Sequence, residues 1–291
     1  MLALLLLAAL SSFTTSDHVT LHYETLGHGD PVVILSGGPG FAVGYMKPVA
    51  DVVARHHEAV MFEQRGTGRS AVPDYDSLTF DSAIADLDAL REDLKVKKLT
   101  IVGHSWGGML AMLYAQAHPD RVERIVLIDS GGLSIAFMES FGKNLAARAT
   151  AEDLDTAAYW RDPERRKANP RHAAIEALRA KTPAYFYDRS KGLAFGKELQ
   201  DDGYDPRTFA ALGKSFDKYD VREGMKKLDV PVLIIHGRND PLIAGEELHA
   251  GIPGSKLVWI EKAGHFPWLE QPAAFRNAIE PFLRVQRGLV Q

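Results

Sequence analysis

The chain has 291 residues, of which 46% are hydrophobic, 25% charged and 9% aromatic. This composition is typical of a globular protein with a substantial core, and it excludes disordered, collagen-like and coiled-coil chains. The formal net charge of −4 gives no reason to expect nucleic acid or an anionic membrane surface as a partner. Because the chain has no cysteine, disulfide bonds, thiolate nucleophiles and cysteine-ligated metals are excluded.

The chain opens with an apolar run from Leu2 to Leu10, followed by a polar stretch. A helix of that length spans about 14 Å, roughly half of a bilayer's hydrocarbon core, so stable membrane insertion is not expected. The length is typical of the apolar region of a secretory signal peptide, although no basic residue precedes it and no clean cleavage site follows. We therefore expect residues 1–16 to direct secretion or periplasmic export. The alternative is a cytoplasmic protein with a short apolar helix packed on the domain.

The elements of the following chain alternate between strands and helices. Residues Val19 to Glu24 alternate apolar and polar side chains, which predicts a half-buried antiparallel strand. Continuous apolar runs, typical of strands buried on both faces, follow at Val32–Leu35, Ala59–Phe62, Leu99–Val102, Ile125–Ile128, Val232–Ile235 and Lys256–Ile260. Between them, Phe80 to Leu94 and Met109 to Ala117 have helical periodicity. This order predicts right-handed crossovers and a mostly parallel sheet in an α/β fold.

One long segment, residues 132–228, interrupts this alternation. It is helical and loop-like, contains several prolines and has no run typical of a buried strand. Because it lies between two expected core strands, we interpret it as an inserted helical cap, or lid. The core would then comprise residues 17–131 and 229–291.

The strongest chemical signal is the sequence GHSWGG at residues 103–108, which follows an expected strand and precedes an apolar helix. This is a G-x-S-x-G motif in the strand–turn–helix context that a nucleophile elbow requires. The small neighbours allow a sharp turn that presents the Ser105 hydroxyl, and the helix N-terminus favours developing negative charge. The structural alternative is a glycine-rich turn with an incidental serine, but the context favours a catalytic Ser105.

A serine nucleophile needs a base that is itself oriented by an acid. Asp240 and His265 follow the last two expected strands, in the chain order Ser, acid, His. Asp129 is a rival acid because it ends the strand before the cap, but Asp240 alone is presented on a turn beyond its strand. His104 and His236 are poorly placed as bases, since one is in the elbow and the other within a strand. The expected triad is therefore Ser105, Asp240 and His265.

A glycine-rich loop, residues 36–40, follows the strand Val32–Leu35. Its backbone N–H groups can converge on a carbonyl oxygen without interference from side chains. We expect the amides of Gly38 and Trp106 to form an oxyanion hole, although the loop alone could be an ordinary tight turn. The chain has no H-E-x-x-H, P-loop or dinucleotide-binding motif. No cofactor and no metal are therefore expected.

Together these segments resemble the α/β-hydrolase superfamily and, within it, the proline iminopeptidase family. The loop at residues 37–40 is similar to that family's HGGPG, and the loop at residues 63–70 is similar to its DQRGxGxS. The resemblance implies an eight-stranded, mostly parallel sheet flanked by helices, with an inserted helical cap. It also implies the Ser105–Asp240–His265 triad and oxyanion donors at Gly38 and Trp106. Ser36 and Glu63 depart from the family pattern.

The resemblance implies an acyl-enzyme hydrolase that removes proline or a small residue from the N-terminus of a short peptide. Recognition of a free amine requires carboxylates in the pocket, and the sequence does not single out any of the cap's acids. His104 gives the motif G-H-S-x-G, which is also common in esterases and lactonases, so an esterase or lactonase with the same triad is the alternative. A non-catalytic binding protein is a third hypothesis, but it would have no use for a strained elbow. Each hydrolase hypothesis implies a small-molecule partner.

Overall fold

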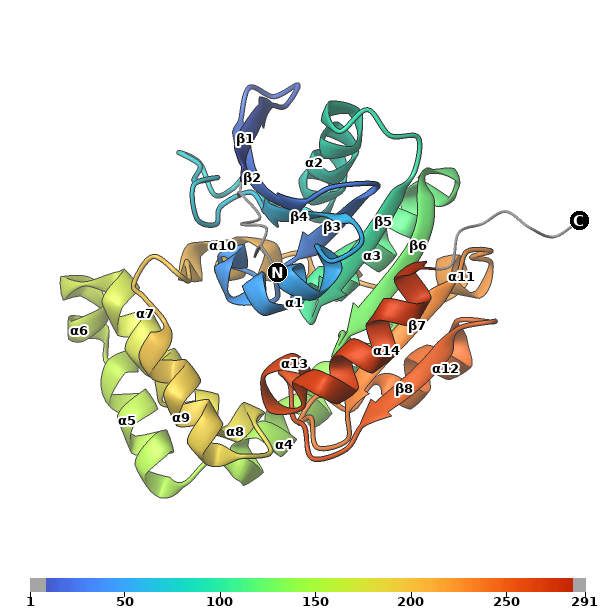
Figure 1. The fold of residues 1–291 in the computed structure, drawn as a ribbon. Coiled ribbons are helices and arrows are strands. Elements are labelled where there is room, and N and C mark those ends of the chain that lie inside the picture. Colours follow the sequence, from blue (N-terminus) through green and yellow to red (C-terminus); the bar gives the residue numbers. More distant parts are fainter. Residues whose placement is uncertain (1–8, 285–291) are drawn as a thin grey trace, which may run out of the picture.

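The computed structural model describes residues 9–284, which form one central sheet, flanking helices and a helical lobe (Figure 1). The sheet has eight strands in the order β1-β2-β4-β3-β5-β6-β7-β8. The two antiparallel strands are β1 (Ala9–Thr14) and β2 (Thr20–Gly27). The parallel strands are β3 (Pro31–Leu35), β4 (Glu58–Glu63), β5 (Leu99–His104), β6 (Val122–Ile128), β7 (Val232–Gly237) and β8 (Lys256–Ile260). The expected α/β fold with an eight-stranded, mostly parallel sheet is confirmed.

The continuous apolar runs exist because helices cover both faces of the sheet. Within β3, Val33 and Leu35 pack into one hydrophobic cluster and Val32 and Ile34 into the other. The first cluster is covered by α2 (Phe80–Asp93), α3 (Trp106–Ala117), α11 (Arg222–Lys226) and α12 (Gly245–Gly251). The second is covered by the 3-10 turn η1 (Val43–Met46), α1 (Lys47–Val53), α13 (Pro267–Glu270) and α14 (Pro272–Arg284). The loops that follow the carboxyl ends of such buried strands carry the polar groups.

Between β6 and β7 the chain forms the helices of the cap (Figure 1). They are α4 (Phe137–Arg148), α5 (Ala151–Arg161), α6 (Pro163–Ala168), α7 (Pro170–Arg179), α8 (Thr182–Tyr185), α9 (Arg189–Glu198) and α10 (Pro206–Gly213). The prolines that gave this segment its loop-like appearance occupy the first turns of α6, α7, α8 and α10, where a missing N–H costs nothing. Side chains of Asp162, Asn169 and Asp205 cap three of these helices.

The N-terminal segment expected to be an export signal is described only from residue 9. Residues 9–14 form strand β1, which pairs antiparallel with β2 and adds an edge to the sheet. Just beyond it, Asp17 accepts hydrogen bonds from Arg65, whose guanidinium also pairs with the buried Asp86. In the part of the chain that the structure describes, no helix has both the length and the apolar character needed to span a bilayer.

Candidate active site

Ser105 lies in a sharp turn between β5 and α3. Its backbone adopts φ 53° and ψ −116°, a conformation rare for a residue with a side chain. The turn depends on its glycines, because a Cβ on Gly103 would lie 2.3 Å from the carbonyl oxygen of Gly107. The Ser105 N–H donates to the carbonyl of Ile128 at 2.9 Å, which anchors the turn to the next strand. These contacts present the Ser105 hydroxyl to the pocket described below.

His265 and Asp240 meet at the ends of neighbouring strands. The Nδ1 of His265 is 2.9 Å from Oδ2 of Asp240, and both side chains are buried. Asp240 also accepts the N–H of Leu242 at 2.9 Å. Burial lowers the pKa of the His265 imidazole, so the ring is neutral near pH 7. With Nδ1–H donated to Asp240, Nε2 keeps its lone pair and can accept a proton.

Asp129, the rival acid, lies beside this pair rather than outside it. One carboxylate oxygen of Asp129, one of Asp240 and one ring nitrogen of His265 lie within 4.8 Å of one another. One Asp129 oxygen accepts the N–H of Gly237 at 2.8 Å, whereas its buried Oδ2 has no donor among the described residues. Burial and the neighbouring Asp240 raise the pKa of Asp129 well above its ordinary value. Burial also raises the pKa of Asp240, to about 8, so that simultaneous ionisation of both carboxyls is disfavoured. We assign the retained proton to Asp129, because Asp240 accepts hydrogen bonds from both His265 and Leu242.

The expected oxyanion donors lie on the same pocket as Ser105 and His265. Gly38 has φ 119°, a region that disfavours side chains. Trp106 is the first residue of α3, so its N–H has no acceptor within the helix. Gln64 connects these two segments: its amide donates to the carbonyl of Ser36 at 2.9 Å and accepts from the Trp106 indole at 2.9 Å. The DQRG-like loop thus supports the glycine loop, a role that its sequence did not reveal.

Sequence reasoning also missed a hydrogen-bonded relay beneath the nucleophile. The N–H of Gly37 donates to the Tyr45 hydroxyl at 2.6 Å, and this hydroxyl is 2.7 Å from Nδ1 of His104. Nε2 of His104 is in turn 2.9 Å from the carbonyl oxygen of His265. Burial lowers the pKa of His104 well below its usual value, so the ring is neutral. We assign its proton to Nε2, because the carbonyl oxygen of His265 can only accept. His104 therefore connects three loops, and only its departure from the family's motif marked it in the sequence.

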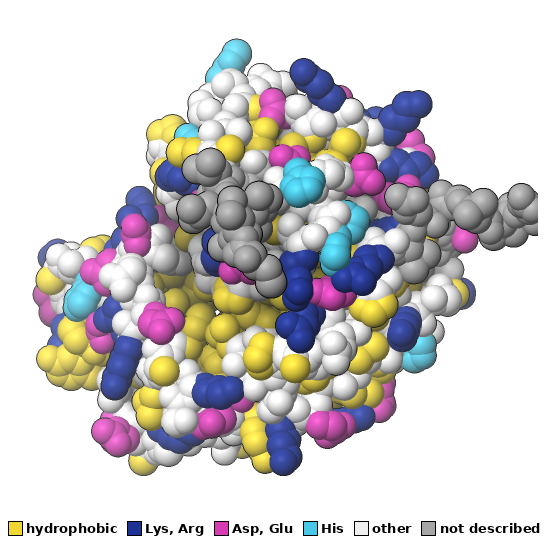
Figure 2. All heavy atoms as spheres, viewed as in Figure 1, with side chains coloured by type: hydrophobic (Ala, Val, Ile, Leu, Met, Phe, Trp, Pro, Cys, Tyr) yellow, Lys and Arg dark blue, Asp and Glu magenta, His cyan; other side chains and the backbone are white. Residues whose placement is uncertain are grey.

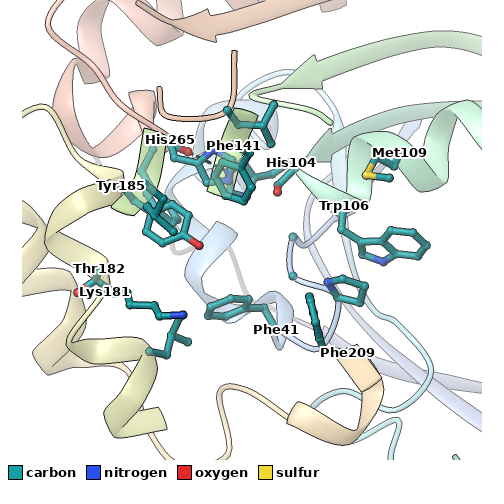
Figure 3. A pocket seen from close by; sticks show the side chains of 18 of the residues that line it. Phe41, His104, Trp106, Met109, Phe141, Lys181, Thr182, Tyr185, Phe209 and His265 are labelled. Carbon is teal, nitrogen blue, oxygen red and sulfur yellow. Dashed lines mark hydrogen bonds between the residues drawn. The ribbon is translucent and has the colours of Figure 1, made fainter. Parts of the chain in front are cut away.

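A pocket of about 280 Å³ lies between this machinery and the cap. In Figure 2 hydrophobic side chains gather in a hollow between the cap lobe and the core. Figure 3 shows the side chains of Phe41, Phe141, Tyr185 and Phe209 around this space. Apart from the two neutral histidines, Lys181 is the one ionisable basic group that lines it, and none of the lining residues among residues 9–284 carries a carboxylate.

The sequence belongs to a well-populated group of hydrolases. The family model described as "alpha/beta hydrolase fold" matches residues 30–272. A proline iminopeptidase of Lactobacillus acidophilus is 29% identical over 283 residues, covering 90% of this chain and 94% of that protein. A proline iminopeptidase of Saccharolobus solfataricus is 26% identical over 271 residues, covering 90% and 87%.

Solved structures similar to this one include hydrolases of other specificities. An enol-lactonase from Burkholderia xenovorans has a TM-score of 0.71 at 23% identity, with 94% of this chain and 99% of that chain covered. An esterase from Rhodococcus sp. has a TM-score of 0.71 at 23% identity, with 94% and 98% covered. At this level of identity the likeness concerns the fold. The chain therefore belongs to the α/β-hydrolase fold family, and its sequence is proline iminopeptidase-like.

Proposed function

We propose that this protein is a serine hydrolase that works through an acyl-enzyme. His265 accepts the Ser105 proton at Nε2 while the Ser105 oxygen attacks the substrate's carbonyl carbon. The amides of Gly38 and Trp106 hold the oxyanion, and Asp240 keeps His265 oriented and stabilises its cation. His265 then protonates the leaving group, and the acyl-enzyme is hydrolysed by a water molecule that His265 deprotonates.

The proposed substrate is an ester or lactone whose acyl group is apolar next to the carbonyl. The observation that carries this choice is the composition of the pocket, whose lining includes aromatic side chains and Lys181 but no carboxylate among the described residues. A free N-terminal amine is a cation, and without a carboxylate its desolvation in this pocket would be costly. Ester cleavage requires no such group.

Two buried carboxylates that could bind an amine, those of Asp205 and Glu270, already have hydrogen-bond or ion-pair partners. Asp205 pairs with Arg207 at 2.7 Å and with Arg171 at 3.0 Å. Glu270 accepts the backbone N–H groups of Gly264 and Asp188 at 2.6 and 2.8 Å. These contacts use the acids to stabilise the cap and the histidine loop, which supports the ester proposal.

Aminopeptidase activity is the second candidate, and the proline iminopeptidases among the relatives favour it. An apolar pocket of this size suits a prolyl group, and the backbone machinery would serve amide cleavage equally well. The candidate requires a carboxylate to approach the pocket when substrate binds.

A paired assay separates the two candidates. Initial rates would be measured for 4-nitrophenyl butanoate, prolyl-4-nitroanilide and the same anilide with its amine acetylated, with Ser105→Ala as the control for background hydrolysis. We expect rapid ester cleavage and slow cleavage of both anilides. Rapid cleavage of the free-amine anilide that disappears on acetylation would contradict the ester proposal and establish an aminopeptidase.

A further inference from the structure

Lys181 is an unusual presence in an otherwise apolar pocket. It lies between α7 and α8 on the cap side, and Figure 3 shows its side chain extending into the space toward Phe41. Its neighbours on the wall include Phe41, Tyr185 and Phe209. An amine among such groups loses part of its hydration, and burial accordingly lowers the pKa of Lys181.

No acidic partner compensates this charge among the residues that the structure describes. The Lys181 ammonium makes no hydrogen bond or ion pair with them, and the charge that acts on it most is that of Arg161, which is also positive. Two other cap cations, in contrast, are paired: Arg189 contacts Asp153 at 2.7 Å and Arg171 contacts Asp205 at 3.0 Å. A partly buried cation without a counter-ion, aimed into a ligand cavity, is suited to receive an anion from the ligand.

The position of Lys181 indicates where that anion would be in a substrate. Figure 3 shows Lys181 on the side of the pocket opposite Trp106, away from His104 and His265. The substrate carbonyl must be at Ser105, between His265 and the amides of the oxyanion hole. The apolar walls formed by Phe41 and Tyr185 then enclose the intervening atoms. This geometry describes an acyl chain that is apolar in the middle and charged at its far end.

We propose that Lys181 forms a subsite for a carboxylate at the distal end of the acyl group, so that the favoured substrates are half-esters of aliphatic dicarboxylic acids. The inference rests on the proposed ester hydrolysis and names its substrate class. It assigns Lys181 a role in specificity, since the reaction at Ser105 does not use its amine.

The test compares 4-nitrophenyl half-esters of succinic, glutaric and adipic acids with neutral 4-nitrophenyl esters of the same chain length. The measured quantity is the ratio of kcat/KM for the charged ester to that for its neutral counterpart. Lys181→Met removes the charge and keeps an unbranched apolar chain, whereas Lys181→Arg keeps the charge. Lys167→Met, an exposed cap lysine outside the pocket, is the matched control.

We expect the wild type to favour at least one charged ester, and Lys181→Met to lower the ratio by about 10- to 100-fold, as for loss of a hydrogen bond to a charged group. Lys181→Arg should keep most of the preference, and Lys167→Met all of it. Equal losses on charged and neutral esters, or an unchanged ratio in Lys181→Met, would overturn the subsite.

A second measurement separates this inference from the proposed reaction. Binding of glutarate monomethyl ester to Ser105→Ala, followed by calorimetry, does not require turnover. Binding that weakens by about 10-fold or more on adding Lys181→Met supports the subsite even if no ester is hydrolysed. Absence of binding, or binding that Lys181→Met does not change, overturns the subsite and leaves ester hydrolysis to be judged by the activity assay.

Discussion

The two sides of the pocket are built on different principles. On the core side, Ser105, Asp240 and His265 project from the ends of buried parallel strands, and hydrogen bonds to the backbone hold them in place. On the cap side, the wall consists of aromatic and aliphatic side chains on short helices, with Lys181 as its charged group. Under the proposed function, the core would determine which bond breaks, whereas the cap would determine which molecule is admitted.

The largest expected effect is on the core side. Ser105→Ala removes the nucleophile, so kcat should fall by about 10³-fold or more, to the residual rate supported by the oxyanion hole and binding. Steady-state rates on the best ester would measure this loss, and a fluorophosphonate probe should label only the protein that retains Ser105. Wild-type turnover in the variant would contradict the assignment of the core side as the reacting side.

The second prediction contrasts the two buried acids. Asp240→Asn should lower kcat by about 10³- to 10⁴-fold, because His265 loses the carboxylate that orients it and stabilises its cation. Asp129→Asn should cost less than about 10-fold, since an amide can donate to Asp240 as the protonated acid does. Rates of both variants on one ester check this. Equal losses would mean that Asp129 shares the role of triad acid.

The Asp129→Asn variant should also change how the free energy of unfolding depends on pH. Because the pKa of Asp129 is raised in the folded state, its contribution is favourable below the unfolded value near 3.8 and is lost as pH rises through the folded value. Asp129→Asn cannot ionise, so its free energy of unfolding relative to wild type should increase between pH 4 and pH 8. Urea titrations at both pH values measure the difference, and a decrease would contradict the shared proton.

A third prediction concerns the relay between the loops. Tyr45→Phe leaves the Gly37 N–H and Nδ1 of His104 without their shared partner, which should cost about 1–3 kcal/mol of stability. If the relay positions the oxyanion loop and His265, kcat should also fall by several fold while KM changes little. Thermal unfolding and steady-state kinetics separate the two effects. A loss of stability with unchanged kcat would reduce the relay to a packing role.

The smallest expected effect comes from a buried histidine behind the triad. Burial lowers the pKa of His236 to about 4, so this ring stays neutral in the folded protein while it is protonated in the unfolded chain below about pH 6.5. Its stabilisation is therefore present above pH 6.5 and is lost as pH falls toward 4. His236→Gln should therefore reduce the slope of the unfolding free energy against pH, between about pH 6.5 and pH 4, by at most about 1.4 kcal/mol per pH unit. An unchanged slope would assign the acid sensitivity to other groups.

The sequence predicted the core side far better than the cap side. Continuous apolar runs mark β3 to β7 because each such strand is buried on two faces, and the loops after β5 and β7 carried Ser105 and Asp240. His265 follows β8, where the expectation of burial on both faces is wrong, because β8 is an edge strand and only partly buried. The cap gave no comparable pattern, since its helices bury one narrow face and begin at prolines such as Pro163 and Pro170. The sequence did not single out Lys181, because a lysine in a helical segment is ordinarily a surface residue.

The N-terminal segment shows a further limit. The polar residues after the apolar run suggested the end of an export signal, yet residues 9–14 alternate in exposure as an edge strand. Pairing with β2 supplies the reason, because a short edge strand acquires its hydrogen bonds from a neighbouring strand, here the next one along the chain. Residues 1–8 lie outside the described part of the chain, so the export hypothesis remains a prediction.

The contact between His265 and the cap has a mechanical consequence. The His265 N–H donates to the carbonyl of Tyr185 at 2.8 Å, and Glu270 joins the adjacent Gly264 to the start of α9 through two backbone N–H groups. Any hinge motion that lifts this part of the cap must break these bonds and release the loop that carries the base. The position of the proposed base is therefore coupled to the position of α8, so that a displacement of one would also displace the other.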